Sequence, residues 1–235
     1  GFIFLASVFF LQYIFSNACI ALPQTAPKTE VITLSFVGDC TLGTDEDFTW
    51  NTFDEVYKKV NDPGYFFQGV KSIFQQDDFT LANLEGALTT SVEMVEKEYN
   101  YKGDPSYAEI LVRGGVDAVT LANNHTLDFG EAGFQDTIHA LNRYNIAYTH
   151  YETVIIKEIK GVKIAFLGYT GWGYDYHVRM LLDKQVKDLR AAGVDYIVAN
   201  FHWGEMRSYE PNSNQKKMAY YAVDHGVDLV VGHHP

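Results

Sequence analysis

Short apolar runs alternate with amphipathic stretches along the chain from Val31 onward. The first run covers 31–37, is rich in β-branched residues and ends just before Asp39. A second run covers 79–82 and ends at Asn83. Runs of this length and composition, each followed by polar residues, predict buried β-strands.

Three later segments share one order of residues, which forms a weak internal repeat. They cover 115–125, 193–202 and 226–233. Each begins with Gly-Val-Asp, continues as an apolar run and reaches a His at or near its end. A glycine is suited to the left-handed residue that follows a helix. Each segment therefore predicts the end of a helix, then a buried strand, then a histidine at the carboxyl end of that strand.

Apolar residues between these strands recur at helical spacing, as at Phe134, Ile138 and Leu141. Asp128 and Glu131 have the spacing of a capping box, which predicts the start of that helix. Strands that alternate with helices predict a mostly parallel sheet with helices on both faces. We favour an open α/β sheet, with a barrel as the alternative.

Two further apolar runs, 154–159 and 162–168, are separated only by Lys160 and Gly161. So short a connection predicts two strands joined by a tight turn.

Residues 1–22 carry no charge and are long enough to span a bilayer. The same run suits a secretory signal, with Ser16-Asn17-Ala18 as a cleavage pattern. A buried helix is less favoured, because aromatic residues occupy every face. We therefore expect an apolar N-terminal helix that is a transmembrane anchor or signal segment, followed by a linker at 23–30. The remainder would then lie at the extracellular face of the cell membrane, or be secreted if the segment is cleaved.

The chain begins with Gly1, and its last apolar run reaches Pro235 without a closing element. We therefore expect 31–235 to be one domain that lacks its C-terminal part.

Charge narrows the range of partners. Lys and Arg number 18 against 30 Asp and Glu, a formal net charge of −12. Binding to a phosphate backbone needs an excess of basic residues, so nucleic acid is excluded as a partner. A divalent cation offsets nearby carboxylates, so the acidic balance is compatible with a metal site.

Polar side chains with metal-binding or proton-transfer chemistry follow several predicted strands. Because the carboxyl ends of parallel strands meet at one edge of a sheet, we expect these side chains to lie together. A single residue of this kind is usually a turn or cap, so the repetition at several strand ends is the evidence for a site. The residues are Asp39, Asn83, Glu85, Asn124, His125, His202, His233 and His234.

Oxygen and imidazole ligands in this mixture suit a divalent Mn, Fe or Zn ion, or a pair of such ions. The sequence has no pair of cysteine ligands, which excludes a structural zinc finger. Asn124 would be a neutral oxygen ligand. His125 would then be free to act as a catalytic general acid or to stabilise negative charge.

Five blocks of this sequence resemble the signatures of the bacterial capsule-synthesis family, the CapA-like poly-γ-glutamate proteins. The blocks cover 36–43, 82–86, 121–130, 201–205 and 231–235, in the order of that family. The Asn-Asn-His and His-Trp-Gly strings are the specific ones. The resemblance spans 31–235 and implies a fold related to calcineurin-like metallophosphoesterases, a layered α/β/β/α sandwich. The 160–161 hairpin would then belong to a second sheet.

The resemblance also implies roles for individual residues. Thr41 stands where phosphoesterases carry a histidine ligand, and Asn83 stands where they carry a bridging aspartate. His125 matches the catalytic histidine. The implied metal ligands are Asp39, Asn83, Glu85, Asn124, His202, His233 and His234.

The function that the resemblance implies is synthesis or export of poly-γ-glutamate capsule. The partners would be that anionic polymer and the membrane synthase subunits. Two alternatives remain: a metal-dependent hydrolase of phosphoester or amide bonds in a cell-envelope substrate, and a binding module with an inert site. Trp203 and Glu205 from the family block, and Trp172 from an aromatic loop after a strand, are the expected substrate-binding residues.

Overall fold

The structure, a computed structural model, describes residues 30–234. The expected apolar N-terminal helix at 1–22, and almost all of the linker at 23–30, lie outside the described residues. No helix within 30–234 is both long enough and apolar enough to cross a membrane. Every strand and helix described belongs to the unit that begins at Ile32.

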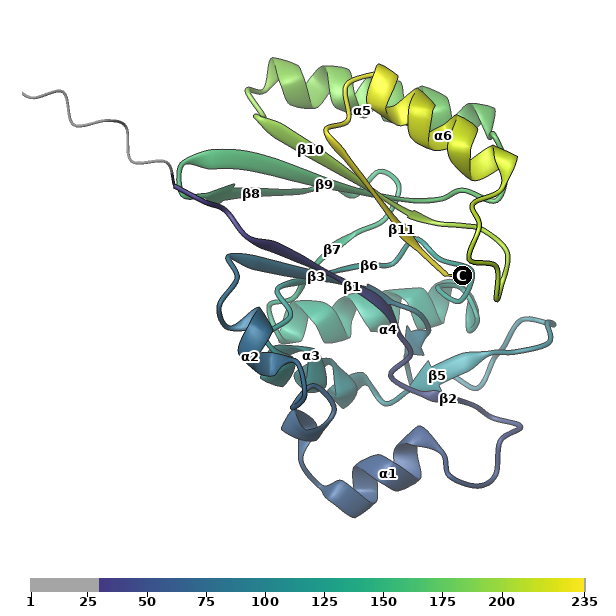
Figure 1. Ribbon diagram of the computed structural model, residues 1–235. Helices are drawn as coiled ribbons and strands as arrows, with labels where there is room; N and C mark the ends of the chain where they lie inside the picture. The colour runs from purple at the N-terminus through teal and green to yellow at the C-terminus, as the bar shows by residue number, and fades with distance from the viewer. Residues whose placement is uncertain (1–29, 235) are drawn as a thin grey trace, which may run out of the picture. The chain divides into compact units, whose positions relative to one another are not determined.

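The first sheet is fully parallel (Figure 1). Its strands lie in the order β1 (Leu34–Cys40), β3 (Phe79–Leu84), β6 (Ala118–Thr120) and β7 (Ala147–Thr149). β1 begins and ends three residues later than the apolar run at 31–37, because its pairing with β3 starts at Leu34 and continues past Gly38 to Cys40. A register shift between Val37 and Asp39 sets Asp39 opposite Asn83.

The second sheet has one reversed strand at its edge. Its strands lie in the order β11 (Leu229–His233), β10 (Tyr196–His202), β9 (Val162–Thr170) and β8 (Ile155–Ile159). β8 is antiparallel to β9, and the other neighbours are parallel. Lys160 and Gly161 join β8 to β9 with φ angles of 50° and 80°. Two left-handed residues in succession are what a two-residue hairpin requires, so the predicted hairpin is confirmed.

The expectation of a single open sheet, or a barrel, was wrong, because the strands form two sheets (Figure 1). β8 turns the chain back on itself, and β9 then begins a second sheet instead of extending the first. Apolar side chains of the two sheets pack against each other, with the rings of Phe79 and Phe166 stacked at 4.7 Å between centroids.

Helices cover the outer face of each sheet. α3 (Ala108–Gly114) and α4 (Gly130–Arg143) pack on the first sheet, while α5 (Tyr176–Ala191) and α6 (Ser213–Asp224) pack on the second. The layers therefore run helix, sheet, sheet, helix (Figure 1). This α/β sandwich agrees with the arrangement that the family resemblance implies.

The glycines of the repeated segments support the prediction made for them. Gly115, Gly193 and Gly226 have φ angles of 89°, 76° and 100°. They follow α3, α5 and α6 and precede β6, β10 and β11. The repeat therefore marks three successive helix-to-strand connections.

The capping box predicted at Asp128 and Glu131 does not form. α4 begins at Gly130 after Phe129, with no side-chain cap. Asp128 cannot act as the cap because its carboxylate accepts hydrogen bonds from other parts of the chain, described below.

Smaller elements lie after the carboxyl ends of β1 and β3 in the chain. A three-stranded sheet contains β2 (Thr44–Asp45), β5 (Tyr101–Gly103) and β4 (Ala87–Leu88), in that order. Two short helices, α1 (Phe53–Val60) and α2 (Lys71–Phe74), and 3-10 turns at Pro63–Tyr65 and Pro105–Tyr107 complete the described part. The small sheet places the connection between β4 and β5, residues 89–100, beside the strand ends at which the sequence predicts a metal site.

Candidate metal centre

The carboxyl ends of strands from both sheets meet at Asn83, the buried penultimate residue of β3. Its side-chain Nδ2 donates a hydrogen bond to Oδ1 of Asp39 at 2.7 Å and lies 3.1 Å from Nδ1 of His202. Asp39 belongs to β1 of the first sheet, and His202 is the last residue of β10 in the second. The strand ends that the sequence predicted to converge therefore do so at this point.

Three potential metal ligands come together beside this contact. Glu85 follows β3, His202 ends β10 and His234 follows β11. Their ligand atoms all lie within 4.8 Å of one another, and no other such group of three occurs within residues 30–234. Oε1 of Glu85 lies 3.6 Å from Nε2 of His202.

These residues fit a divalent metal ion. Nε2 of His202 is buried and has no hydrogen-bond partner. A buried polar atom without a partner is costly, and a bound cation would satisfy it. Coordination through Nε2 requires the ring proton to be on Nδ1. Nδ2 of Asn83, also a donor, lies 3.1 Å from Nδ1, so metal binding would require this amide to turn aside and leave Oδ1 of Asp39, at 3.9 Å, as the acceptor. One carboxylate and two imidazoles form a donor set that suits Zn, Mn or Fe.

The burial of the cluster favours neutral groups. Burial, together with the negative charge of Asp39, raises the pKa of Glu85 to about 8. Burial lowers the pKa of His202 to about 3, against the opposing effect of Asp39. Burial also lowers the pKa of His233 and of His234. A cation bound among these groups would favour the carboxylate form of Glu85 and keep the imidazoles neutral.

His125 lies next to the three ligands, with its orientation set by Asp128. Nδ1 of the ring is 2.7 Å from Oδ2 of Asp128, and Nε2 is 3.8 Å from Oε1 of Glu85. The ring also packs on Tyr101 at 4.3 Å between centroids. Because a carboxylate can only accept, it favours a proton on Nδ1 and leaves Nε2 directed towards Glu85.

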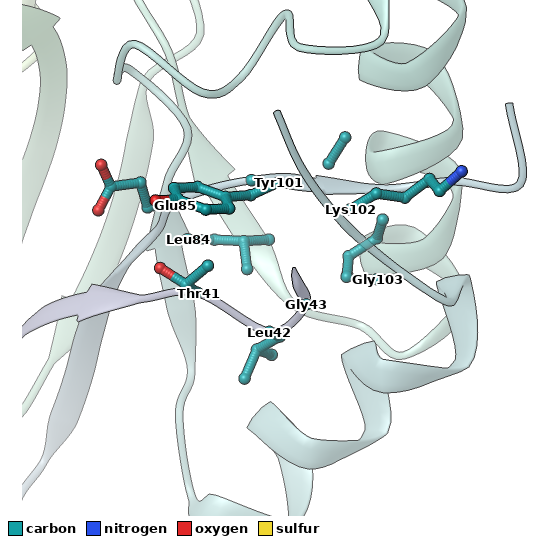
Figure 2. Close-up of a pocket in the computed structure, with 11 residues that line it drawn as sticks. Thr41, Leu42, Gly43, Leu84, Glu85, Tyr101, Lys102 and Gly103 are labelled. Atoms are coloured by element: carbon teal, nitrogen blue, oxygen red, sulfur yellow. The ribbon is translucent and has the colours of Figure 1, made fainter. Parts of the chain in front are cut away.

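The cluster opens onto a cavity of about 470 Å³. Glu85 and Tyr101 also line a second pocket, drawn in Figure 2, where the carboxylate of Glu85 points away from the amine of Lys102. Glu85, His125 and His234 all line the 470 Å³ cavity. The wall consists of Thr41, Glu85, Lys97, Glu98, Tyr99, Tyr101, Asn124, His125, Met206 and His234.

Two residues expected as ligands occupy different positions from the rest. The side chain of Asn124 is exposed at the cavity wall, and its neighbour Asn123 is the buried one. Asn123 donates through Nδ2 to Oδ1 of Asn83 at 3.0 Å, and its own Oδ1 accepts from the backbone N–H of His125. His233 is buried, and its Nε2 lies 3.5 Å from Oδ1 of Asn200. It is not among the three convergent ligands.

The expected substrate-binding residues divide into three kinds. Trp203 is only 7% exposed and stacks on Phe201 at 4.6 Å, so its assignment to substrate is corrected to the core of the second sheet. Glu205 is exposed on the loop after β10 and does not line the cavity. Trp172 is 45% exposed, and its ring meets those of His234 and His202 edge-on at 4.8 and 5.6 Å. Trp172 alone of the three contacts the cluster.

Sequence reasoning missed four residues around His125. Asn123 is next to the predicted ligand Asn124, and Asp128 follows His125 at a spacing of three. The ligand role was given to Asn124 instead, and Asp128 was expected to cap a helix. Lys97 and Tyr101 lie in or just after the irregular 89–100 connection, and no sequence periodicity brings them to the strand ends. They are found only once the small sheet is in place.

The fold and the site define a class of protein: a two-sheet α/β sandwich with a carboxylate–imidazole cluster at its strand ends. Residues 33–235 match the model of the bacterial capsule synthesis protein PGA_cap family. The chain therefore belongs to the bacterial capsule synthesis family, and the resemblance noted in the sequence is confirmed.

Relatives of known name agree with this family. The chain is 25% identical to the capsule biosynthesis protein CapA of Bacillus anthracis, over 91% of this chain and 56% of that protein. It is 26% identical to the PGA biosynthesis protein CapA of Bacillus subtilis, over 88% and 58%. A probable polyglutamine synthesis accessory protein of Mycobacterium tuberculosis is 27% identical over 66% and 49%. The chain thus spans about half the length of the curated relatives it matches.

One solved structure supports the fold. A hypothetical protein from Thermus thermophilus matches with a TM-score of 0.51 and 18% identity, covering 86% of this chain and 67% of that one. At this identity the likeness concerns the fold alone.

Proposed function

We propose that this chain acts in the synthesis or export of a poly-γ-glutamate capsule. The observation that carries the proposal is the family match over residues 33–235, together with relatives named for capsule and PGA biosynthesis. The proposed partners are the anionic polymer and the membrane synthase subunits. The proposed location is the extracellular face of the cell membrane, held by the N-terminal segment, or the exterior if that segment is cleaved.

We also propose that Glu85, His202 and His234 hold a divalent Mn, Fe or Zn ion. The support is the convergence of their ligand atoms within 4.8 Å and the unpartnered Nε2 of His202. When bound, such an ion polarises a substrate oxygen and lowers the pKa of water. Asp39 and Asn83 orient His202 from the side of Nδ1.

A second candidate function is a metal-dependent hydrolase of phosphoester or amide bonds in a cell-envelope substrate. It is favoured by the position of His125, whose Nε2 is directed towards the cluster and the cavity. In such a reaction Nε2 of His125 would take up the proton of the attacking water and deliver it to the leaving group, while Asp128 keeps the ring oriented. Trp172 borders the cluster and would limit the size of a bound group.

Charge argues that polymer binding depends on the metal. The chain has a net charge of −12, and Lys97 is the one Lys or Arg among the described residues of the cavity wall. That lysine is already paired with Asp128. A polymer of carboxylates would be repelled by this surface unless a bound cation attracts it.

Complementation of a strain that lacks the intact gene tests the proposal. We expect the deletion to remove surface polymer, and the full-length wild-type gene to restore it. Glu85→Gln should fail to restore it, because the cluster loses its carboxylate. Glu158→Gln, the same change at an exposed position of β8, is the matched control and should restore it.

Metal analysis of the purified full-length proteins separates the two parts of the proposal. Loss of a ligand should lower the metal affinity of Glu85→Gln by about tenfold or more, while Glu158→Gln stays at the wild-type value. Normal polymer in the deletion strain would contradict the capsule role. Full restoration by Glu85→Gln would contradict the role of the metal. Turnover of phosphoesters or of poly-γ-glutamate with Mn²⁺ would favour the hydrolase.

A further inference from the structure

Lys97 reaches from the 89–100 connection into the polar network behind His125. Its Nζ lies 2.6 Å from Oδ1 of Asp128, 2.9 Å from the backbone oxygen of Asn124 and 3.2 Å from Nδ1 of His125. The side chain of Lys97 is 27% exposed, whereas that of Asp128 is 1% exposed. The pair therefore joins a partly solvated cation to a carboxylate that water does not reach.

Asp128 gathers several donors at one side chain. Oδ1 accepts from Lys97, and Oδ2 accepts from the backbone N–H of Tyr101 at 2.7 Å and faces Nδ1 of His125. Its backbone oxygen also accepts from the N–H of Val95 at 2.9 Å. The connection above the cavity and the ring of His125 are thus fixed to the same residue.

Lys97 is the cation paired with this buried carboxylate. Without that contact, the Asp128 carboxylate would no longer be held on the side of Lys97 and could turn away from the ring. Nδ1 of His125 would then lose its acceptor. The ring proton could then be on Nε2, the nitrogen directed towards Glu85.

We infer that Lys97 is a positioning residue for His125, acting through Asp128. Lys97 holds the Asp128 carboxylate in place, and Asp128 holds the ring with its proton on Nδ1. Nε2 of His125 is then free to exchange a proton at the cavity. The inference rests on the proposed function for the use made of Nε2, but the position of the ring proton can be measured without it.

The contacts of Lys97 argue against the alternative, that it binds an anionic group of the substrate. Two of its three N–H donors are directed at Asp128 and at the oxygen of Asn124. The third N–H lies on the side of Nδ1 of His125, which donates to Asp128 and does not accept from Lys97. Two hydrogen bonds therefore hold the ammonium group within the protein.

Nuclear magnetic resonance of the full chain labelled with ¹⁵N-histidine tests the inference. The His125 signals are assigned by their absence in His125→Gln. We expect Nδ1 of His125 to be protonated in the wild type and in Lys97→Arg, which keeps the charge. In Lys97→Met, which keeps most of the stem, the Nδ1 and Nε2 shifts should move towards the opposite tautomer, as in Asp128→Asn.

Unchanged His125 shifts in a folded Lys97→Met protein would overturn the inference. If that variant does not fold, the wild-type spectrum still decides, because a neutral ring with its proton on Nε2 is incompatible with the proposed arrangement. Surface polymer gives a second readout: Lys97→Met should lower it by about tenfold, and Lys97→Arg should restore it. If the deletion strain makes normal polymer, the proposed function fails, while the ring measurement still tests Lys97.

Discussion

Trp172 and Trp203 follow neighbouring strands, β9 and β10, yet they have different surroundings. Trp203 is buried against Phe201 and belongs to the apolar cluster beneath α5 and α6. Trp172 is exposed on one side and contacts two histidine rings on the other. One tryptophan therefore supports the fold, and the other borders the cluster.

We expect Trp203→Ala to lower the free energy of unfolding by about 3–5 kcal/mol, because it leaves a large cavity in the core. Trp172→Ala should change it by less than about 1 kcal/mol, since a half-exposed ring loses little burial. Urea denaturation of both variants measures the difference. Equal losses would show that the core assignment of Trp203 is mistaken.

The sequence predicted which kinds of residue gather at the site, but not which of two neighbours takes each role. Asn123 and Asn124 have the same chemistry, and the path of the loop alone decides that Asn123 is buried and Asn124 exposed. Asp128 has the spacing of a cap, and only the positions of Lys97 and Tyr101 show why its carboxylate turns inward. Such choices depend on contacts between distant segments, which residue patterns do not contain.

The hairpin between β8 and β9 is the element on which the two-sheet arrangement depends. Its turn needs two left-handed residues, Lys160 and Gly161. A Cβ at Gly161 would meet no atom within 4 Å, so any cost of adding one comes from the backbone itself.

Gly161→Ala should lower the free energy of unfolding by about 1 kcal/mol, because alanine disfavours the left-handed conformation that this φ requires. Gly173→Ala is the control: its Cβ would also meet nothing within 4 Å, and its φ lies outside the left-handed region. It should leave stability unchanged or slightly raised. Thermal unfolding of both variants checks the expectation, which would be refuted if they lost the same stability.

Boundaries were predicted less well than the elements themselves. The apolar run at 31–37 indicated a strand correctly, but the ladder of β1 runs from Leu34 to Cys40. Pairing with β3 keeps polar residues such as Asp39 within the strand, and hydropathy cannot show this. The repeated glycines were more informative, since Gly115, Gly193 and Gly226 all have left-handed φ angles between a helix and the strand that follows it.

The packing of the two sheets on each other is the feature of the whole molecule that sequence periodicity did not predict. Strands buried on both faces look the same in one open sheet and in two stacked sheets. The family resemblance implied the second arrangement, and the structure has it. Phe166 is wholly buried at this contact, with Phe79 stacked on it and Phe36 at 6.4 Å.

Phe166→Ala should lower the free energy of unfolding by about 3–5 kcal/mol. Hydrogen exchange should show that amides of β3 and β10 lose protection together, because the two sheets share this core. Phe48→Ala, at a side chain that is 52% exposed, is the matched control and should stay within about 0.5 kcal/mol of the wild type. Loss of protection in β10 alone would mean that the sheets unfold separately.

The three convergent ligands are supplied by both sheets. Glu85 follows a strand of the first, whereas His202 and His234 belong to the ends of strands in the second. An ion bound among them would hold the two halves of the sandwich together, and at a hundred times its dissociation constant would add about 2.7 kcal/mol to stability. Metal binding and the packing of the two sheets would then be thermodynamically linked. A cell short of that metal would contain a protein that is less stable as well as one without its ion.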